Sequence, residues 1–390
     1  MGAKHHPTTD VIHLGEGAHP QATPLTVPVY TTTTFLFDNA AELEAYQAGT
    51  SQKYIYSRYA NPTVQAAEQK LAALEGADAA LITSSGMAAA ATALFGLLET
   101  GVEVVCSAAI YGGTLQVMTK YLAHFGVGAR FASLEDLARP ESLMGPTTRV
   151  LWFESPINPT LRCVDIAGVA AACRRAGVVS IIDNTFASPV NQRPLEFGID
   201  LVMHSATKYL NGHSDVTAGA LIGRADLIDR LQPARKLFGG VLEPASAYAL
   251  GRGLKTLELR VTRQNESAAA IARWLERDAR VVRVFYPGLA SHPDHEIARK
   301  QMRGFGGMVC FDVGSYAAAS RVFDRLQIVR RAASLGGPES LCSLPVLTSQ
   351  YGFSDEQLAA AGVTRGMLRL SVGLEHVDDL IADLDQALRS

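Results

Sequence analysis

Short apolar runs alternate with longer segments of helical periodicity between residues 61 and 223. The apolar runs are β-branched or continuously hydrophobic, as in strands covered on both faces, and lie at 79–83, 102–106, 149–153, 178–183, 200–204 and 217–223. Between them, 86–98, 113–125 and 166–177 have the spacing of helices. An earlier helix is predicted to begin at Pro62 and end at Gly76. This alternation predicts the α/β class, with a mostly parallel sheet and helices on both faces.

The regions on either side have different patterns. Residues 1–60 are rich in turn residues and threonine, which predicts an N-terminal arm that wraps a neighbour. Residues 61–250 form the predicted large domain. Residues 245–278 form one long helical stretch, expected to kink near Gly251 or Gly253. Strand patterns at 281–286, 307–313 and 367–372, with a helix around 317–326 and another at the C-terminus, predict a smaller α+β domain over 251–390.

Composition excludes several function classes. The chain has 390 residues, 48% of them hydrophobic, and a formal net charge of -3, which gives no electrostatic footprint for nucleic acid or an anionic membrane. The N-terminus lacks the apolar core of a signal peptide, and the longest apolar run, 86–98, is too short to span a bilayer. Five scattered cysteines without a CxxC pair argue against a disulfide scaffold or a metal site. We therefore expect a soluble, cytoplasmic protein without a metal.

Polar motifs follow four of the predicted strands: TSSGM, ESPINP, DNTFASP and HSATKYLNGHSD. Because ligands of an open α/β sheet bind beyond the carboxyl ends of its strands, these motifs predict one shared site. The first, Ser84 to Met87, turns a strand into a helix, where free amides attract an anion such as phosphate, although such a turn can also be only a turn. Ser205 and Thr207 could add hydroxyl donors to the same anion.

Two charged residues at strand ends suggest a cofactor. Asp183 could be a turn or cap residue, or a buried carboxylate that pairs with a cation such as a protonated pyridine nitrogen. Lys208 could extend to solvent, or it could be an amine whose pKa is lowered so that it forms a Schiff base. A phosphate site, an anion for a ring nitrogen and a reactive lysine together predict pyridoxal 5'-phosphate (PLP).

The chain also resembles the PLP-dependent enzymes of cysteine and methionine metabolism (trans-sulfuration), which include cystathionine γ-synthase, cystathionine γ-lyase and methionine γ-lyase. The matching stretches occur in family order over nearly the whole chain: YSRYANPT, SSGMAA, YGGT, ESPINP, DNTFASP, HSATKYLNGHSD, RGLKTLELR, SLGGPESL and RLSVGLE. The resemblance implies PLP fold type I (aspartate aminotransferase-like), with a seven-stranded sheet.

The resemblance also implies residue roles. Lys208 would form the internal aldimine and shuttle protons, and Asp183 would pair with the pyridine nitrogen. Cofactor contacts would further come from Gly86, Met87, Tyr111, Thr185, Ser205 and Thr207. Tyr111 would stack on the ring and could transfer protons. The substrate carboxylate would be bound by Asn158 and Arg369, with Ser334 nearby.

The arm residues Tyr56 and Arg58 would complete the phosphate site of a neighbouring subunit. The resemblance therefore implies a homo-oligomer, a catalytic dimer usually paired into a tetramer, acting on a small amino-acid substrate.

Several positions distinguish members of the family. Enzymes that handle cystathionine tend to carry acidic residues where this chain has Ile55 and Ala333, whereas apolar residues there resemble methionine γ-lyases and homoserine-ester sulfhydrylases. Gly113 replaces the cysteine that is usual in methionine γ-lyases, and Ser349-Gln350 replaces a common Thr-His pair. We expect γ-elimination or γ-replacement on a homocysteine- or homoserine-derived amino acid.

The alternatives are a homoserine-ester sulfhydrylase, a cystathionine β-lyase or an aminotransferase on the same fold. A nucleotide-binding oxidoreductase is disfavoured because no GxGxxG follows a strand.

Overall fold

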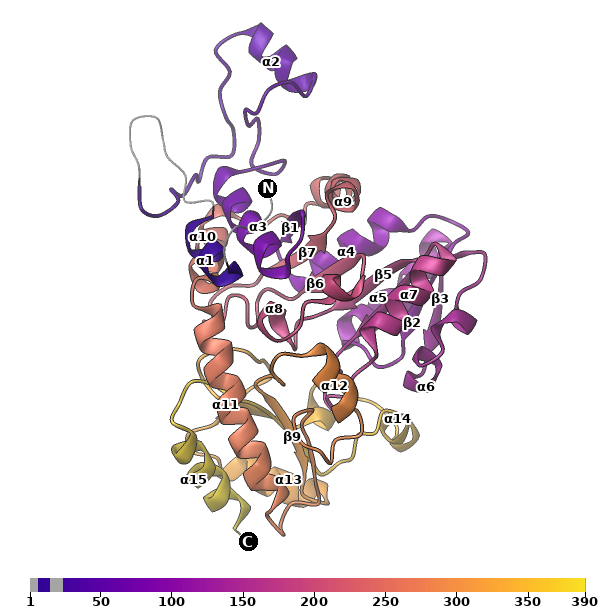
Figure 1. Cartoon of the computed structure of the whole chain (residues 1–390), viewed down its shortest axis with the longest axis vertical. Helices are drawn as coiled ribbons and strands as arrows, with labels where there is room; N and C mark the ends of the chain where they lie inside the picture. The colour runs from indigo at the N-terminus through magenta and orange to yellow at the C-terminus, as the bar shows by residue number, and fades with distance from the viewer. Residues whose placement is uncertain (1–5, 15–23, 390) are drawn as a thin grey trace.

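The computed structural model describes residues 6–14 and 24–389, and a seven-stranded sheet forms its centre (Figure 1). The strand order is β1-β7-β6-β5-β4-β2-β3, and only β7 runs opposite to the others. The strands are β1 (Ala79–Thr83), β2 (Glu103–Ser107), β3 (Gly128–Ala132), β4 (Thr148–Glu154), β5 (Val179–Asp183), β6 (Leu201–His204) and β7 (Gly219–Gly223). The predicted α/β fold is confirmed. The pattern missed β3, because this edge strand is mostly exposed and lacks an apolar run.

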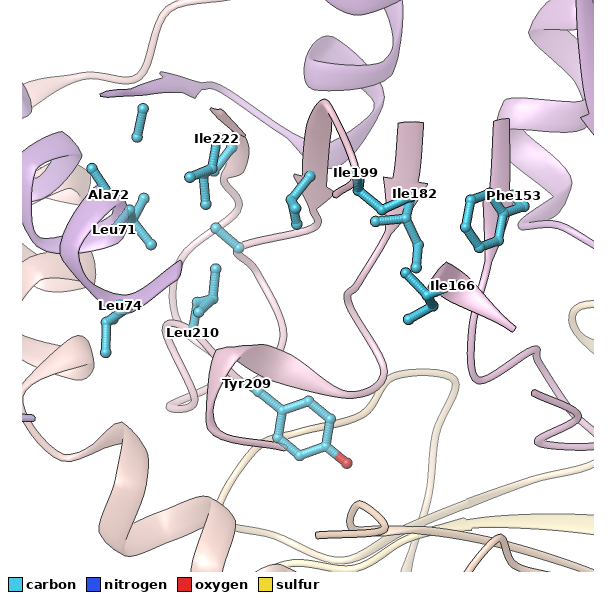
Figure 2. Packing of buried hydrophobic residues seen from close by; sticks show 14 of the residues in the cluster. Leu71, Ala72, Leu74, Phe153, Ile166, Ile182, Ile199, Tyr209, Leu210 and Ile222 are labelled. Atoms are coloured by element: carbon cyan, nitrogen blue, oxygen red, sulfur yellow. The ribbon is translucent and has the colours of Figure 1, made fainter. Parts of the chain in front are cut away.

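Helices cover both faces of this sheet, as predicted. Alternate strand residues point to opposite faces, so Phe153 and Ile182 face one helix layer while Trp152 and Ile181 face the other. Figure 2 shows the first layer, where Leu71 and Ile166 approach the strands. That layer contains α3 (Pro62–Glu75), α7 (Ile166–Ala176) and α10 (Pro244–Leu254), and the other contains α4 (Gly86–Leu97), α5 (Gly112–Lys120) and α9 (Ala225–Phe238).

The predicted limits of α3 agree with its capping. The Asn61 side chain accepts a hydrogen bond from the Thr63 amide, and Gly76 ends the helix with a left-handed φ of 70°.

The long helical stretch after Pro244 is two helices, α10 and α11 (Leu257–Glu276). The interruption lies at residues 255–256, just beyond the expected kink. There the Gly253 carbonyl accepts hydrogen bonds from the Thr256 hydroxyl at 3.2 Å and from the Arg260 guanidinium at 2.8 Å. These bonds replace regular helical pairing. The helix α11 then leads from the large sheet to the C-terminal part of the chain (Figure 1).

A second, five-stranded sheet forms the C-terminal part, with the order β10-β11-β12-β9-β8. Its strands are β8 (Arg283–Phe285), β9 (Met308–Asp312), β10 (Arg330–Arg331), β11 (Leu341–Ser343) and β12 (Met367–Ser371). It has its own core, which includes Leu275, Phe311 and Leu368. Its helices are α12 (His295–Gln301), α13 (Tyr316–Arg325), α14 (Asp355–Ala360) and α15 (Val377–Leu388). The domain limits near residues 60 and 250 stay predictions.

The N-terminal region contains two helices that the sequence pattern did not show. Helix α1 (Pro7–His13) packs on α3 through the buried Val11, whereas α2 (Ala40–Gln47) projects from the top of the molecule in Figure 1 and buries no residue. Residues 1–5 and 15–23 of the predicted arm lie outside the described residues. Its contact with a neighbour stays a prediction.

The remaining short helices are α6 (Leu134–Leu137), α8 (Ser188–Asn191) and the 3-10 turns η1 (Leu122–Phe125), η2 (Pro140–Leu143), η3 (Pro194–Phe197) and η4 (Pro345–Leu347). All five cysteines are buried and unpaired. Within the described part of the chain, no helix has both the length and the hydrophobicity to cross a membrane, and no cluster of side chains has the make-up of a metal site.

Candidate active site

The ends of β5 and β6 are joined by hydrogen bonds that place Asp183 at the edge of the sheet. Asp183 is buried, and its Oδ1 accepts the Thr185 amide at 3.0 Å. The Thr185 hydroxyl oxygen in turn accepts the Ser205 amide at 2.8 Å. Because the strands are parallel and adjacent, the two loops that follow them meet, and three of the predicted site residues are brought together.

Asp183 lies in an environment that disfavours its charge. Burial raises the pKa of Asp183, although the hydrogen bonds from Thr185 and the nearby His204 oppose the increase. His204 is itself buried and lies 2.6 Å from a Glu75 carboxylate oxygen. A cationic ligand group beside Asp183 would therefore favour the ionised carboxylate, as a protonated ring nitrogen would.

Lys208 lies in the turn after β6, with its amine directed at the C-terminal part of the chain. Its amide donates to the Ser205 carbonyl at 3.1 Å, and its Nζ donates to Ser334 Oγ at 3.0 Å. Burial, followed by the positive charge of Arg369, lowers the pKa of Lys208. A lowered pKa increases the fraction of neutral amine, which is the nucleophilic form.

Arg369 binds the two other predicted substrate-binding residues, Asn158 and Ser334. It lies on β12, where Nη1 donates to Asn158 Oδ1 at 2.9 Å and Nη2 donates to the Ser334 carbonyl at 3.3 Å. Its Nε is buried and has no hydrogen-bond partner. The planar guanidinium thus has a donor left for a carboxylate, the group to which arginine binds in a bidentate manner.

The start of α4 provides the candidate phosphate site. A Cβ atom at Gly86 would lie 3.0 Å from Ser205 Cβ, so a glycine allows these two segments to approach. The Ser85 hydroxyl accepts a hydrogen bond from the Ala88 amide. The free amides of the first helical turn form the positive end of the helix dipole, which attracts an anion.

Thr207 is held by the backbone of a neighbouring segment. Its hydroxyl oxygen accepts the Ala218 amide at 2.9 Å and donates to the Ala218 carbonyl at 3.1 Å. The structure therefore engages this hydroxyl elsewhere, and its predicted phosphate contact stays a prediction.

Tyr111 lies at the first turn of α5, and its side chain is 53% exposed. Its ring packs over Gly113, where a Cβ atom would lie 2.7 Å from Tyr111 Cε1 and 2.8 Å from Met87 Sδ. Its amide donates to the buried carboxyl group of Glu154, the last residue of β4. Sequence reasoning quoted the motif that contains Glu154 but gave this residue no role. Its position directly after the apolar run 149–153 was the available signal.

Tyr56 and Arg58 lie with the arm and α9. Arg58 Nη1 donates to the Lys236 carbonyl at 2.8 Å, and its guanidinium lies 4.9 Å from the Tyr59 ring centroid. Tyr56 forms a β-bridge with Thr34. In the described residues of this single chain, neither is in contact with Lys208.

Two of the positions that distinguish family members, Ala333 and Ser349, border this site, whereas Ile55 lies in the arm. Ala333 is exposed beside Ser334, and the Ile55 carbonyl accepts the Phe35 amide within the arm. The Ser349 carbonyl lies 3.8 Å from the Cβ position of Gly112, so its loop borders the start of α5.

The residues present fit PLP. Asp183 is a buried carboxylate that forms no ion pair within the described residues, and it matches the ring nitrogen of this cofactor. The partly buried amine of lowered pKa matches the aldehyde, and the glycine cradle at a helix N-terminus matches the phosphate.

Comparisons with known proteins agree with this chemistry. A family model described as "Cys/Met metabolism PLP-dependent enzyme" matches residues 8–389. An L-methionine gamma-lyase from Pseudomonas putida is 43% identical over 385 residues, covering 98% of this chain and 97% of that protein. An O-succinylhomoserine sulfhydrylase from Pseudomonas aeruginosa is 39% identical, covering 96% and 91%.

A solved structure has the same fold along its whole length. It is a putative O-acetylhomoserine (thiol)-lyase from Campylobacter jejuni that contains a pyridoxyl-lysine monophosphate. It superposes with a TM-score of 0.93 at 33% identity, covering 99% of this chain and 100% of that one.

Proposed function

The chain belongs to the Cys/Met metabolism PLP-dependent enzyme family, and from this premise we propose that it eliminates a thiol from the γ-carbon of methionine or a similar S-alkyl homocysteine. The coarser activity, PLP-dependent γ-elimination or γ-replacement on trans-sulfuration amino acids, is that of its relatives. The finer choice is supported by the relatives named L-methionine gamma-lyase, which are 40% to 43% identical.

One observation carries the proposal: the Lys208 amine and the Arg369 guanidinium are both bound to Ser334. Arg369 and Asn158 would bind the α-carboxylate of the amino acid, which places its α-carbon near Lys208 Nζ. When bound, PLP supplies an aldehyde that captures the amino group and a ring that accepts the electrons of the broken bond. Lys208 Nζ would then remove and return the α-proton, and Asp183 would hold the charge on the ring nitrogen.

Tyr111 would act at the other side of the substrate. Its half-exposed ring at the start of α5 would cover the cofactor ring, and its hydroxyl could give a proton to the departing thiolate.

The distal part of the site favours an uncharged leaving group. Ile55 and Ala333 provide no carboxylate for the distal ammonium of cystathionine, and a methyl thioether needs none. The second candidate is γ-replacement on an acylated homoserine. It is supported by the relative named O-succinylhomoserine sulfhydrylase and by the thiol-lyase structure.

We also propose that the protein acts in the cytoplasm as a catalytic dimer, paired into a tetramer. The arm supports a dimer, because α2 buries no residue within the chain and Arg58 is not in contact with Lys208.

The purified, PLP-loaded enzyme should be assayed with methionine, homocysteine, cystathionine, cysteine and acylated homoserines, with and without sulfide or cysteine. We expect methionine to give a volatile thiol, ammonia and a four-carbon oxo acid without any acceptor. A product that forms only from an acylated homoserine and sulfide would instead establish replacement. Pyruvate from cystathionine would indicate β-elimination, and a requirement for an oxo-acid co-substrate would indicate an aminotransferase.

A further inference from the structure

Glu154 is a buried carboxylic acid that the residue roles described so far leave unexplained. It ends β4 and pairs in register with Asp183 at the end of β5. Glu154 is only 5% exposed. Because strand residues alternate between faces, it lies on the same face of the sheet as Trp152, and Asp183 lies on that face with Ile181. Two buried carboxyl groups therefore lie side by side at the cofactor edge of the sheet.

The groups around Glu154 include no cation to balance a second charge. On neighbouring elements it faces the Cys106 thiol of β2, Asp183 of β5 and the Tyr111 amide at the start of α5. His204 of β6 is nearer to Asp183 and is paired with Glu75 of α3. In residues 6–14 and 24–389, no lysine, arginine or histidine forms an ion pair with Glu154.

These surroundings determine which carboxyl group keeps a proton. Burial, followed by the charge of Asp183, raises the pKa of Glu154 well above its ordinary value, and only the Tyr111 amide opposes the increase. Two hydrogen bonds from Thr185 favour the charged form of Asp183, and so does the nearby His204. The charge of the pair therefore resides on Asp183.

We propose that Glu154 is a positioning residue of the cofactor site, which holds Tyr111 over the ring through its backbone amide and stays neutral so that Asp183 is the single anion facing the cofactor. A protonated carboxyl group still has an oxygen that accepts the Tyr111 amide. Tyr111 is otherwise located by the close approach of its ring to Gly113. Without the carboxyl acceptor, the partly buried amide loses its partner and the ring loses its support.

The test compares Glu154→Gln, Glu154→Leu and the exposed control Glu99→Gln. Glutamine keeps the amide acceptor without a charge, so its apoprotein should bind PLP within about threefold of wild type. Leucine removes the acceptor, so binding should weaken about fivefold to tenfold. In Glu154→Leu, the induced circular dichroism of the bound cofactor should also change, because that signal depends on the side chains around the cofactor ring, which include Tyr111. Equal binding and equal spectra for all variants would overturn the positioning role.

Apoprotein melting against pH tests the neutral state separately. A raised folded pKa stabilises the protein below the unfolded pKa of a glutamate, about 4.3, and that stability is lost as pH rises towards the folded pKa. The melting temperature of wild type should therefore fall relative to that of Glu154→Gln as pH rises from about 4.5. The difference in melting temperature between wild type and Glu99→Gln should not change with pH. If the melting-temperature difference between wild type and Glu154→Gln also stays constant, Glu154 is charged.

If Glu154→Leu does not fold, Glu154→Gln and the control Glu99→Gln still test the proposal. PLP binding by Glu154→Gln that is weakened more than tenfold would then contradict the neutral acceptor. The inference rests on the cofactor site proposed at these strand ends. Wild-type protein that fails to bind PLP would refute that site, whereas normal binding with unaffected variants would refute only the role of Glu154.

Discussion

The Lys208 amine donates a 3.0 Å hydrogen bond to Ser334 Oγ, although 126 residues separate the two in the sequence. This bond joins the turn after β6 to the segment between β10 and β11 of the second sheet. The candidate reactive amine is therefore positioned by both parts of the chain, and Arg369 from β12 adds its charge to the same point.

That charge gives a pH prediction for Lys208. Burial is the larger cause of its lowered pKa and Arg369 the second, so Arg369→Met should raise the pKa of Lys208 partway towards that of a free amine. Because only the neutral amine reacts, the midpoint of Lys208 labelling in the apoprotein should move to higher pH. Peptide mass spectrometry across a pH series measures this shift, with the exposed Lys300 as the internal reference. An unmoved midpoint at Lys208 would contradict the assigned role of Arg369.

A shared active site predicts complementation between inactive subunits. Arg58→Ala should weaken PLP binding in the partner's site, and Lys208→Ala should abolish turnover in its own. A mixed dimer would then contain one intact site. After random reassembly of equal amounts, about a quarter of wild-type activity should return, since half the dimers are mixed and each has one working site of two. Mixed dimers that assemble but stay inactive would show that Arg58 serves its own chain.

Close packing at Gly336 predicts a costly substitution. This glycine has a φ of +78°, and an added Cβ atom would lie 2.6 Å from the Tyr209 amide and 3.1 Å from the Lys208 carbonyl carbon. Gly336→Ala should therefore displace the lysine turn as well as strain the backbone, lowering the free energy of unfolding by about 3 kcal/mol or more. It should also reduce PLP content.

The matched control is Gly177→Ala, because Gly177 has a φ of +65° and nothing within 4 Å of the Cβ position. Backbone strain alone should cost about 1 kcal/mol there and leave PLP content unchanged. Denaturant titration and cofactor absorbance measure both quantities. Equal losses for the two variants would mean that packing against Lys208 is unimportant.

The loop that carries Asn158 is anchored by Asp294. Its carboxylate accepts Arg162 Nε at 2.5 Å and the buried Cys163 amide at 2.9 Å. Asp294→Ala leaves this amide unpaired, so the free energy of unfolding should fall by about 2–3 kcal/mol. The displaced loop should raise KM for the amino acid more than it lowers kcat.

The exposed pair Glu296–Arg299 lies on α12, the helix that begins directly after Asp294, and provides a control. Glu296→Ala should change stability by no more than about 0.5 kcal/mol and leave KM unchanged. Thermal unfolding and steady-state kinetics together distinguish the two variants, and a KM effect of similar size in both would refute the anchoring role of Asp294.

Much of the large sheet was predictable because its signals are local. A continuously apolar strand such as β5 is buried on both faces, and a capped helix such as α3 carries its own end signals in Asn61 and Gly76. The exposed edge strands β3 and β10 and the short, mostly buried β11 were missed, because their pairing depends on which segment lies alongside rather than on an apolar run.

The sequence alone determined the family, the cofactor and the strand-end residues such as Asp183 and Lys208, because their motifs are contiguous and parallel strands end at a common edge. Only the tertiary structure decided how Arg369 and Ser334 reach that lysine, and that Glu154 lies beside Asp183. The reason is physical. Burial, charge balance and hydrogen bonding at these atoms depend on neighbours brought together by packing, and the distance between those neighbours is not encoded in their spacing along the chain.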